Sequence, residues 1–247
     1  QKTVEGIGYL SNIIENHDEP RGVSHYLPSY AQNEKGKKLL AAMYFMLKGL
    51  PFIYQGQELG MENKIFTSIE EIDDISTKEE YRRCLEVGYN SDVALKAVGH
   101  YSRDNARTPF QWSDKVNGGF TKGTPWLRMN DNYKTINAAE QLQREDSVFH
   151  FYKKLIALRE QERFSDTIVY GRTEPVLLEE SNIMAYFRRG KGQDILVIGN
   201  FDRVCRTVKV GQTEGEILLN NCKDVQINGD SITLDSCQAL VIAYLSK

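Results

Sequence analysis

Two short apolar runs, each stopped by polar residues, flank an amphipathic segment near the start of this 247-residue chain. The runs cover residues 8–14 and 50–54, and each has the length of a short buried strand. Between them Asn33 can cap a helix, while Gly49 and Pro51 suit its C-terminal end. Strand, helix and strand in this spacing predict a βα repeat with a parallel sheet, which restricts this part of the chain to the α/β class.

The pattern between residues 61 and 126 predicts a long polar excursion with only brief helical stretches, one of them capped by Ser91. Ser147 then suits the cap of a helix over residues 148–159 that closes the α/β part. After about residue 165 come short β-rich runs at residues 183–187, 195–198, 204–210, 216–219, 231–234 and 239–245. Their spacing and turn residues predict a small antiparallel sandwich. We therefore predict one domain over residues 1–165 and a second over residues 166–247.

Composition excludes several classes of partner. Lys and Arg number 31 against 34 Asp and Glu, so no basic field predicts binding to nucleic acid or to an anionic membrane. No apolar run approaches the roughly 20 residues of a membrane span. The four cysteines form no CxxC pair, and this favours reduced thiols in a cytoplasmic protein.

A polar, titratable cluster begins where the first apolar run ends, with Asn16, His17 and Asp18. In a (β/α) barrel the reacting groups lie at the C-terminal ends of the strands. An isolated His-Asp pair is more often structural, with the aspartate capping a turn. Two further polar blocks downstream favour an active site here instead.

Three motifs in order carry a resemblance to a known family. They are NHDEPR at residues 16–21, IYQGQELG at residues 53–60 and RDNARTPFQW at residues 103–112. Together they resemble the α-glucosidase and oligo-1,6-glucosidase branch of glycoside hydrolase family 13, the α-amylase superfamily. The similarity extends over residues 8–159 and, less distinctively, over the sandwich. It implies the C-terminal portion of a (β/α)8 TIM barrel, strands 7 and 8 with their helices, followed by an antiparallel β-sandwich.

The resemblance also implies a chemistry, the retaining hydrolysis of α-glucosidic bonds. Asp18 matches the family carboxylate that stabilises the transition state by binding the 2- and 3-hydroxyls of the reacting glucose. His17 would donate to the same sugar. Arg103 matches the arginine that helps to close the pocket around the non-reducing end of the substrate.

Other residues of the motifs are expected to have structural roles, namely Asn16, Arg21, Glu58 and Arg107. Glu58 is expected to bind backbone beside the tight turn at Gly56, and Arg107 to form a salt bridge that holds its loop. The aromatic residues Phe110, Trp112 and Trp126 can offer ring faces to sugars, although anchoring of the loop is the more common role.

The resemblance places the nucleophilic Asp and the acid Glu after strands 4 and 5 of the barrel, and neither motif occurs in these 247 residues. We therefore expect this chain alone to be inactive, with the N-terminal part of the barrel as its missing partner. The native protein is expected to have roughly 540 to 560 residues. An oligosaccharide substrate is expected, and no metal or organic cofactor.

Several alternatives stay open at this point. Trehalose-6-phosphate hydrolase and sucrose isomerase belong to the same family and share these motifs. Linkage preference is also open, because α-1,6-selective enzymes tend to carry Glu where this chain has Ser76. A non-catalytic relative that serves as an interaction subunit is a different class, and the joint presence of His17, Asp18 and Arg103 argues against it. A carbohydrate-binding module is disfavoured because the predicted sandwich lacks a cluster of aromatic residues.

Overall fold

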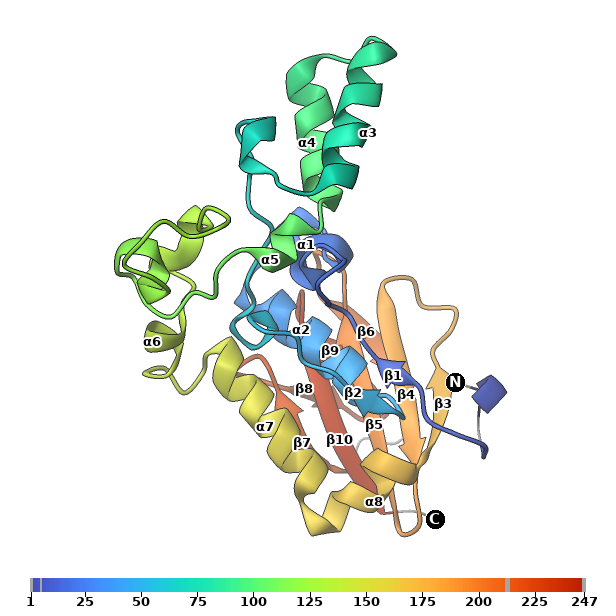
Figure 1. Cartoon of the computed structure of the whole chain (residues 1–247). Helices are drawn as coiled ribbons and strands as arrows, with labels where there is room; N and C mark the ends of the chain where they lie inside the picture. The colour runs from blue at the N-terminus through green and yellow to red at the C-terminus, as the bar shows by residue number, and fades with distance from the viewer. Residues whose placement is uncertain (1, 5, 212–213, 246–247) are drawn as a thin grey trace. The chain divides into compact units, whose positions relative to one another are not determined.

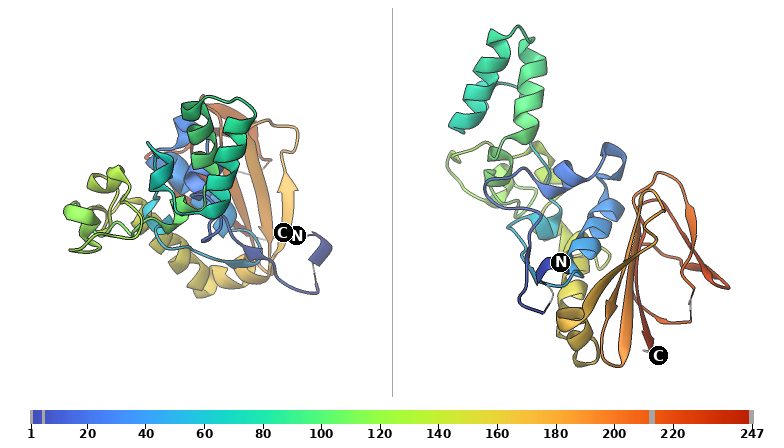
Figure 2. Two further views of the ribbon diagram at one scale, coloured as in Figure 1. Left: turned by 45° about the horizontal axis from the view of Figure 1, so that its top comes forward. Right: turned by 90° about the vertical axis from the view of Figure 1, so that its right-hand side faces the viewer.

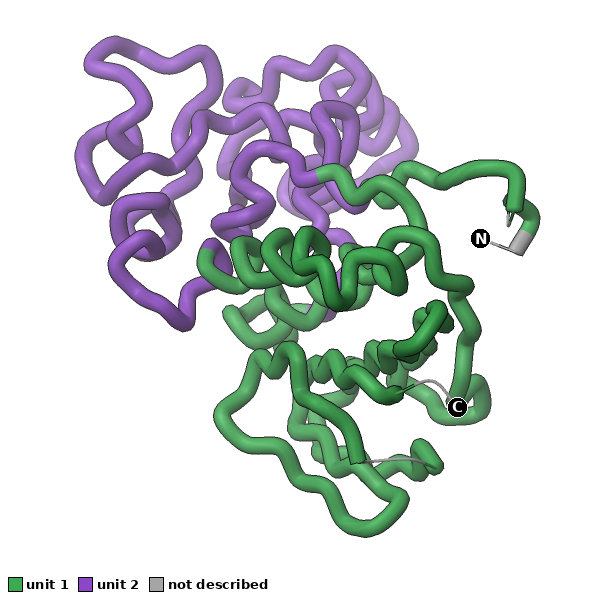
Figure 3. The backbone as a smooth tube through the Cα atoms, turned by 90° about the horizontal axis from the view of Figure 1, so that it is seen from below, with its two compact units in different colours: residues 1–13, 29–52, 150–247 green, residues 14–28, 53–149 purple. Residues whose placement is uncertain are grey.

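The computed structural model describes residues 2–4, 6–211 and 214–245 of the chain. Its contacts divide into two compact units, shown in green and purple in Figure 3. Unit 1 comprises residues 1–13, 29–52 and 150–247, and unit 2 comprises residues 14–28 and 53–149. The units alternate along the chain, and the predicted domain boundary at residue 166 stays a prediction.

Two antiparallel sheets form the C-terminal part of unit 1 (Figure 1). The five-stranded sheet has the order β3 (Arg172–Val176), β4 (Ile183–Arg189), β5 (Gln193–Asn200), β10 (Ala239–Leu245) and β7 (Glu216–Asn220). The three-stranded sheet has the order β6 (Arg206–Lys209), β9 (Ser231–Leu234) and β8 (Gln226–Asn228). The predicted antiparallel arrangement is confirmed, and all six predicted runs contain strands. β3 and β8 were missed because β3 contains Pro175 and β8 is exposed throughout, so neither shows apolar alternation.

A shared apolar core explains why the two sheets face each other (Figure 2, right). Leu196 and Ile198 of β5 and Leu240 of β10 pack with Val208 of β6 and Ile232 of β9, and all are buried. Side chains alternate between the faces of a strand, so one face of β5 and β10 fills this core while the other needs separate cover.

Helix α2 (Glu34–Phe45) provides that cover, because it packs against β5 and β10. Asn33 caps it as predicted, with its side chain accepting from the backbone N–H groups of Lys35 and Gly36. The helix ends at Phe45, earlier than the predicted end near Gly49. Tyr186 of β4 ties the sheet to the helix by donating its hydroxyl to the carbonyl of Met43 at 2.7 Å.

The two apolar runs form a parallel pair, β1 (Ser11–Asn12) and β2 (Leu50–Pro51). The parallel pairing agrees with the predicted βα repeat, but the strands are shorter than predicted. The apolar residues in and beside them stay between 42% and 54% exposed, namely Leu10, Ile13, Leu50 and Phe52. Within the part of the chain that the structure describes, no third strand pairs with β1 or β2.

Unit 2 is more helical than the sequence suggested. It contains α1 (Gly22–Tyr26), α3 (Ile75–Glu86), α4 (Ser91–Tyr101), α5 (Asp104–Arg107) and α6 (Ala138–Gln141). Short 3-10 turns lie at Lys2–Val4 and Ser29–Ala31 of unit 1 and at Gln57–Leu59, Ile69–Glu71, Val116–Gly119 and Asp131–Lys134 of unit 2. Helices α3 and α4 pack side by side (Figure 1). The cap of α4 is Asn90 and not Ser91, which is the first residue of the helix.

Two helices connect unit 2 to the sheets along the chain, α7 (Val148–Glu160) and α8 (Glu162–Tyr170). Helix α7 begins directly after Ser147, as predicted. Because α8 runs past residue 165, the strands begin only at Arg172. None of the helices in the described ranges is long and apolar enough to cross a membrane.

Candidate active site

Asp18 lies in unit 2, a few residues beyond the end of β1, in a turn that its neighbours stabilise. The side-chain oxygen of Asn16 accepts the backbone N–H of Asp18 at 2.7 Å, which is the local bond by which asparagine favours turns. The Asp18 side chain is 52% exposed. The turn therefore presents a carboxylate to solvent.

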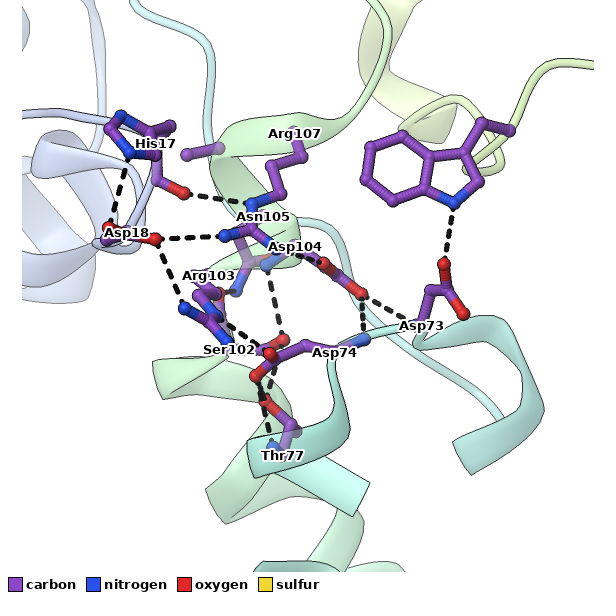
Figure 4. Close-up of polar contacts among 12 residues, drawn as sticks. His17, Asp18, Asp73, Asp74, Thr77, Ser102, Arg103, Asp104, Asn105 and Arg107 are labelled. Carbon is purple, nitrogen blue, oxygen red and sulfur yellow. Dashed lines mark hydrogen bonds and ion pairs between the residues drawn. The ribbon is translucent and has the colours of Figure 1, made fainter. Parts of the chain in front are cut away.

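Three cationic or potentially cationic groups surround this carboxylate (Figure 4). Arg103 Nη1 and Arg107 Nη2 lie 3.2 Å and 2.9 Å from Asp18 Oδ1. His17 Nε2 lies 3.3 Å from Oδ2. The structure thus brings together the three predicted site residues Asp18, His17 and Arg103, and it adds Arg107, which the sequence had assigned only to a structural salt bridge.

The surroundings keep Asp18 ionised. Partial desolvation favours a higher pKa, but the hydrogen bond from Arg103, the charges of His17 and Arg103 and the hydrogen bond from Arg107 outweigh it. The pKa of Asp18 is therefore lowered from its ordinary value. A carboxyl group with a lowered pKa is a poor proton donor near neutral pH, so Asp18 suits electrostatic stabilisation rather than acid catalysis.

Asp74 holds Arg103 in place by binding its Nε, while Arg103 Nη1 contacts Asp18. Arg103 Nε donates to Asp74 Oδ1 at 2.7 Å, and the Asp74 side chain is only 4% exposed. The other carboxylate oxygen accepts from the backbone N–H and the hydroxyl of Thr77 at 3.1 and 2.6 Å, which also caps α3. Because both oxygens are engaged, the carboxylate has a fixed orientation and so does the guanidinium that it binds.

Asp104 supports the same network through the backbone of Asp73 and Asp74 (Figure 4). It is fully buried, and its Oδ2 accepts the backbone N–H groups of Asp73 and Asp74 at 2.7 and 2.9 Å. Its other oxygen lies 3.6 Å from Arg107 Nη1, while Arg107 Nε donates to the carbonyl of His17 at 2.9 Å. The sequence prediction missed the roles of Asp74 and Asp104. The position of Asp104 beside Arg103 in the third motif was the one available signal.

Arg21 is the buried centre of a second cluster that joins the three motifs. Its guanidinium donates to the carbonyls of Gln55, Asn105 and Ala106 and contacts the Glu15 carboxylate at 3.3 Å. Burial raises the pKa of Glu15 to about 7, although Arg21 opposes the shift. Through these hydrogen bonds Arg21, in the first motif, holds the second and third motif segments to its own.

Glu58 and Gly56 lie beside this cluster. Burial raises the pKa of Glu58, while hydrogen bonds from its own backbone and that of Gly56 lower it. Gly56 has a φ of 85°, and a Cβ there would lie 2.4 Å from the sulfur of Met61. The tight turn predicted at Gly56 is therefore present and requires glycine.

The site therefore has one ionised, exposed carboxylate, that of Asp18. Beside it lie the guanidinium groups of Arg103 and Arg107, which also pair with Asp74 and Asp104. Such a carboxylate can accept hydrogen bonds from sugar hydroxyls and stabilise positive charge that develops nearby. The guanidinium groups can donate to hydroxyls without reorienting.

Comparisons with known proteins match this chain to one family and to several relatives. Residues 1–171 match the family described as the α-amylase catalytic domain. An oligo-1,6-glucosidase from Parageobacillus thermoglucosidasius is 44% identical over 202 residues, which cover 81% of this chain and 35% of the relative. A trehalose-6-phosphate hydrolase from Bacillus subtilis (strain 168) is 42% identical over 196 residues, which cover 79% of this chain and 34% of the relative.

A solved structure is similar over the whole chain. It is a single-residue mutant of isomaltulose synthase from Erwinia rhapontici NX5 in complex with D-glucose. Its TM-score is 0.89 and its identity 33%, with coverage of 100% of this chain and 44% of that one. The chain therefore spans between 34% and 44% of the length of these three proteins.

Proposed function

Because the chain belongs to the α-amylase family, glycoside hydrolase family 13, we propose that the site around Asp18 serves the retaining hydrolysis of terminal α-glucosidic bonds in small oligosaccharides. The observation that carries the proposal is the exposed Asp18 carboxylate, ionised and held by Arg103, Arg107 and His17. Glycoside cleavage passes through an oxocarbenium-like transition state, whose positive charge an ionised carboxylate stabilises.

Asp18 acts by binding and not by proton transfer or attack. Its oxygens accept hydrogen bonds from the 2- and 3-hydroxyls of the reacting glucose, and these bonds strengthen as the ring flattens. His17, with its side chain 71% exposed, donates to the same sugar. Arg103, fixed by Asp74, closes the pocket around the non-reducing end.

The covalent step and the protonation of the leaving group belong to other parts of the full enzyme. We assign them to an Asp and a Glu after strands 4 and 5 of a (β/α)8 barrel, in which β1 and β2 here are strands 7 and 8. The parallel pairing of β1 with β2 and the helical connection between them support this assignment. The 247-residue chain alone is accordingly expected to hydrolyse no glucoside. A cytoplasmic location remains a prediction, which the four free cysteines favour.

The substrate is expected to be a neutral oligosaccharide rather than a phosphorylated disaccharide. Arg103 and Arg107 already pair with Asp74, Asp104 and Asp18, and this pairing disfavours their use as a phosphate site. Rates on isomaltose, maltose and trehalose-6-phosphate, together with product analysis on sucrose, would distinguish glucosidase, phosphate-sugar hydrolase and isomerase. Faster cleavage of trehalose-6-phosphate than of both neutral disaccharides would contradict this assignment.

The role of Asp18 is tested by Asp18→Asn in the full-length product of the gene. The amide has the same shape but no charge, so kcat on isomaltose or a nitrophenyl α-glucoside should fall by roughly 10²-fold or more. Far-UV circular dichroism and the unfolding temperature should stay near wild type. Asp114→Asn, at an exposed aspartate outside the site, serves as the control. Near wild-type turnover of Asp18→Asn would remove Asp18 from the mechanism.

A further inference from the structure

The sequence Asn-Gly occurs twice in this chain, at Asn117–Gly118 in unit 2 and at Asn228–Gly229 in unit 1. An asparagine side chain can react with the backbone nitrogen of the next residue, and glycine obstructs that approach least because it has no Cβ. The dipeptide is the same at both places, so the local structure decides which of the two asparagines reacts. The site around Asp18 uses neither of them.

Asn117 is held in an unreactive position. Its Nδ2 donates to the carbonyls of Thr121 at 3.2 Å and Gly123 at 2.9 Å. Gly118 is buried, and a Cβ there would lie 2.6 Å from the terminal methyl carbon of Met129. The Asn117 side chain therefore cannot turn toward the Gly118 nitrogen unless two hydrogen bonds break and a packed segment moves.

Asn228 has neither restraint. It is the last residue of β8, a three-residue strand at the edge of its sheet whose residues are all exposed. Within the described part of the chain, no group forms a hydrogen bond with the Asn228 side chain. A Cβ on Gly229 would meet no atom within 4 Å. A short, exposed edge strand also opens at low cost in free energy, so the side-chain amide and the next backbone nitrogen can approach each other.

We propose that Asn228 is a site of spontaneous covalent modification. The backbone nitrogen of Gly229 attacks Cγ of Asn228, the bond from Cγ to Nδ2 breaks, and ammonia leaves with the proton of the Gly229 amide. The product is a cyclic imide, a succinimide. Water then opens either of its carbonyl groups, which leaves aspartate or, where the main chain runs through Cγ, isoaspartate. The reaction needs no enzyme and no reagent other than water.

The modification alters the hairpin of β8 and β9. Asn228 pairs with Ser231, so Gly229 and Asp230 alone form the turn. Gly229 has a φ of 59°, as a two-residue turn with glycine in its first position requires. Isoaspartate adds a carbon atom to the main chain at this tight turn and places a new carboxylate beside Asp230. The pairing of β8 with β9 is therefore expected to weaken after conversion to isoaspartate.

Peptide mapping by mass spectrometry tests the proposal on the full-length product of the gene. The folded protein and a urea-denatured sample are incubated at the same pH and temperature, and digestion in isotopically labelled water identifies changes that arise only during digestion. In the folded protein, Asn228 should convert to aspartate and isoaspartate at least about tenfold faster than Asn117, because two hydrogen bonds must break at Asn117. In urea the two rates should become similar. Asn228→Ser should abolish the faster release of ammonia.

Three results would contradict this assignment. Equal rates at Asn117 and Asn228 in the folded protein would overturn it, and so would an Asn228 that stays intact in the folded protein while it converts in urea. A Gly229→Ala variant that converts in urea as fast as wild type would show that the nitrogen of residue 229 is not the attacking group. None of these measurements involves turnover, so their outcome is independent of the function proposed for the Asp18 site.

Discussion

At the scale of single residues, the site depends on carboxylates that hold arginines in place as much as on the exposed Asp18. Asp74 does two things, since it fixes Arg103 and caps α3 through Thr77. Asparagine is about as good a helix cap as aspartate but carries no charge. Substitution at this position can therefore separate the two roles.

Asp74→Asn is predicted to lower kcat/KM about tenfold, because Arg103 loses a charge-assisted hydrogen bond. The unfolding temperature should change little because the cap is retained. Glu79→Gln on the same helix, which removes the exposed partner of Arg82 and Arg83, is the control and should leave kcat/KM unchanged. An unaltered kcat/KM for Asp74→Asn would show that Arg103 needs no partner.

Glu15 makes the free energy of unfolding depend on pH. Burial raises its pKa to about 7 from the 4.5 of an exposed glutamate, so the folded protein holds a proton that the unfolded chain releases between these values. The contribution of Glu15 to stability is therefore present at pH 4.5 and is lost as the pH rises through 7, by at most about 3 kcal/mol.

Glu15→Gln removes this titration. The difference in free energy of unfolding, wild type minus variant, should fall as the pH rises from about 5 to 8. Urea unfolding at several pH values measures it. A difference that stays flat or rises over this range would contradict the buried, protonated state of Glu15.

At the scale of elements, the sequence predicts those whose apolar residues repeat at the period of the structure. Helix α2 was predicted from such a pattern and is found, whereas β5 and β10 were predicted from short continuous apolar runs and are buried along most of their length. Helix α3 was missed because Thr77 is its one buried residue, so no apolar stripe marks it. The site shows the same limit. Motifs led to Asp18 and Arg103, whereas Asp74 contacts Arg103 only through a fold that brings positions 29 residues apart together.

The connection between α2 and β2 depends on one glycine. Gly49 has a φ of 140°, and a Cβ there would lie 2.4 Å from the backbone oxygen of Leu10. Gly49→Ala is therefore predicted to reduce the free energy of unfolding by about 2–3 kcal/mol. Gly123→Ala is the control, because its Cβ would meet an ordinary contact at 3.8 Å. Equal stability of the two variants in urea would contradict the tight approach of β1 to this connection.

At the scale of the whole molecule, the β1–β2 pair leaves apolar side chains of unit 1 exposed to solvent. Parallel sheets are normally covered on both faces, and two strands alone are marginally stable. Here apolar side chains beside the pair, such as Leu50 and Phe52, are half exposed. The barrel proposed above would cover such a surface. In the isolated chain, association with a second copy would cover it.

We therefore predict that the 247-residue chain, of 28.3 kDa, forms oligomers when it is expressed alone. Replacing Leu50 and Phe52 together by serine should shift sedimentation toward the monomer, because the apolar surface that drives contact is reduced. Ile65→Ser, at an apolar residue that is 84% exposed in unit 2, controls for a general gain in polarity and should leave the oligomers intact. A wild-type chain that sediments as a monomer across the micromolar range would show that the pair is stable without cover, and would weaken its assignment as part of a closed barrel.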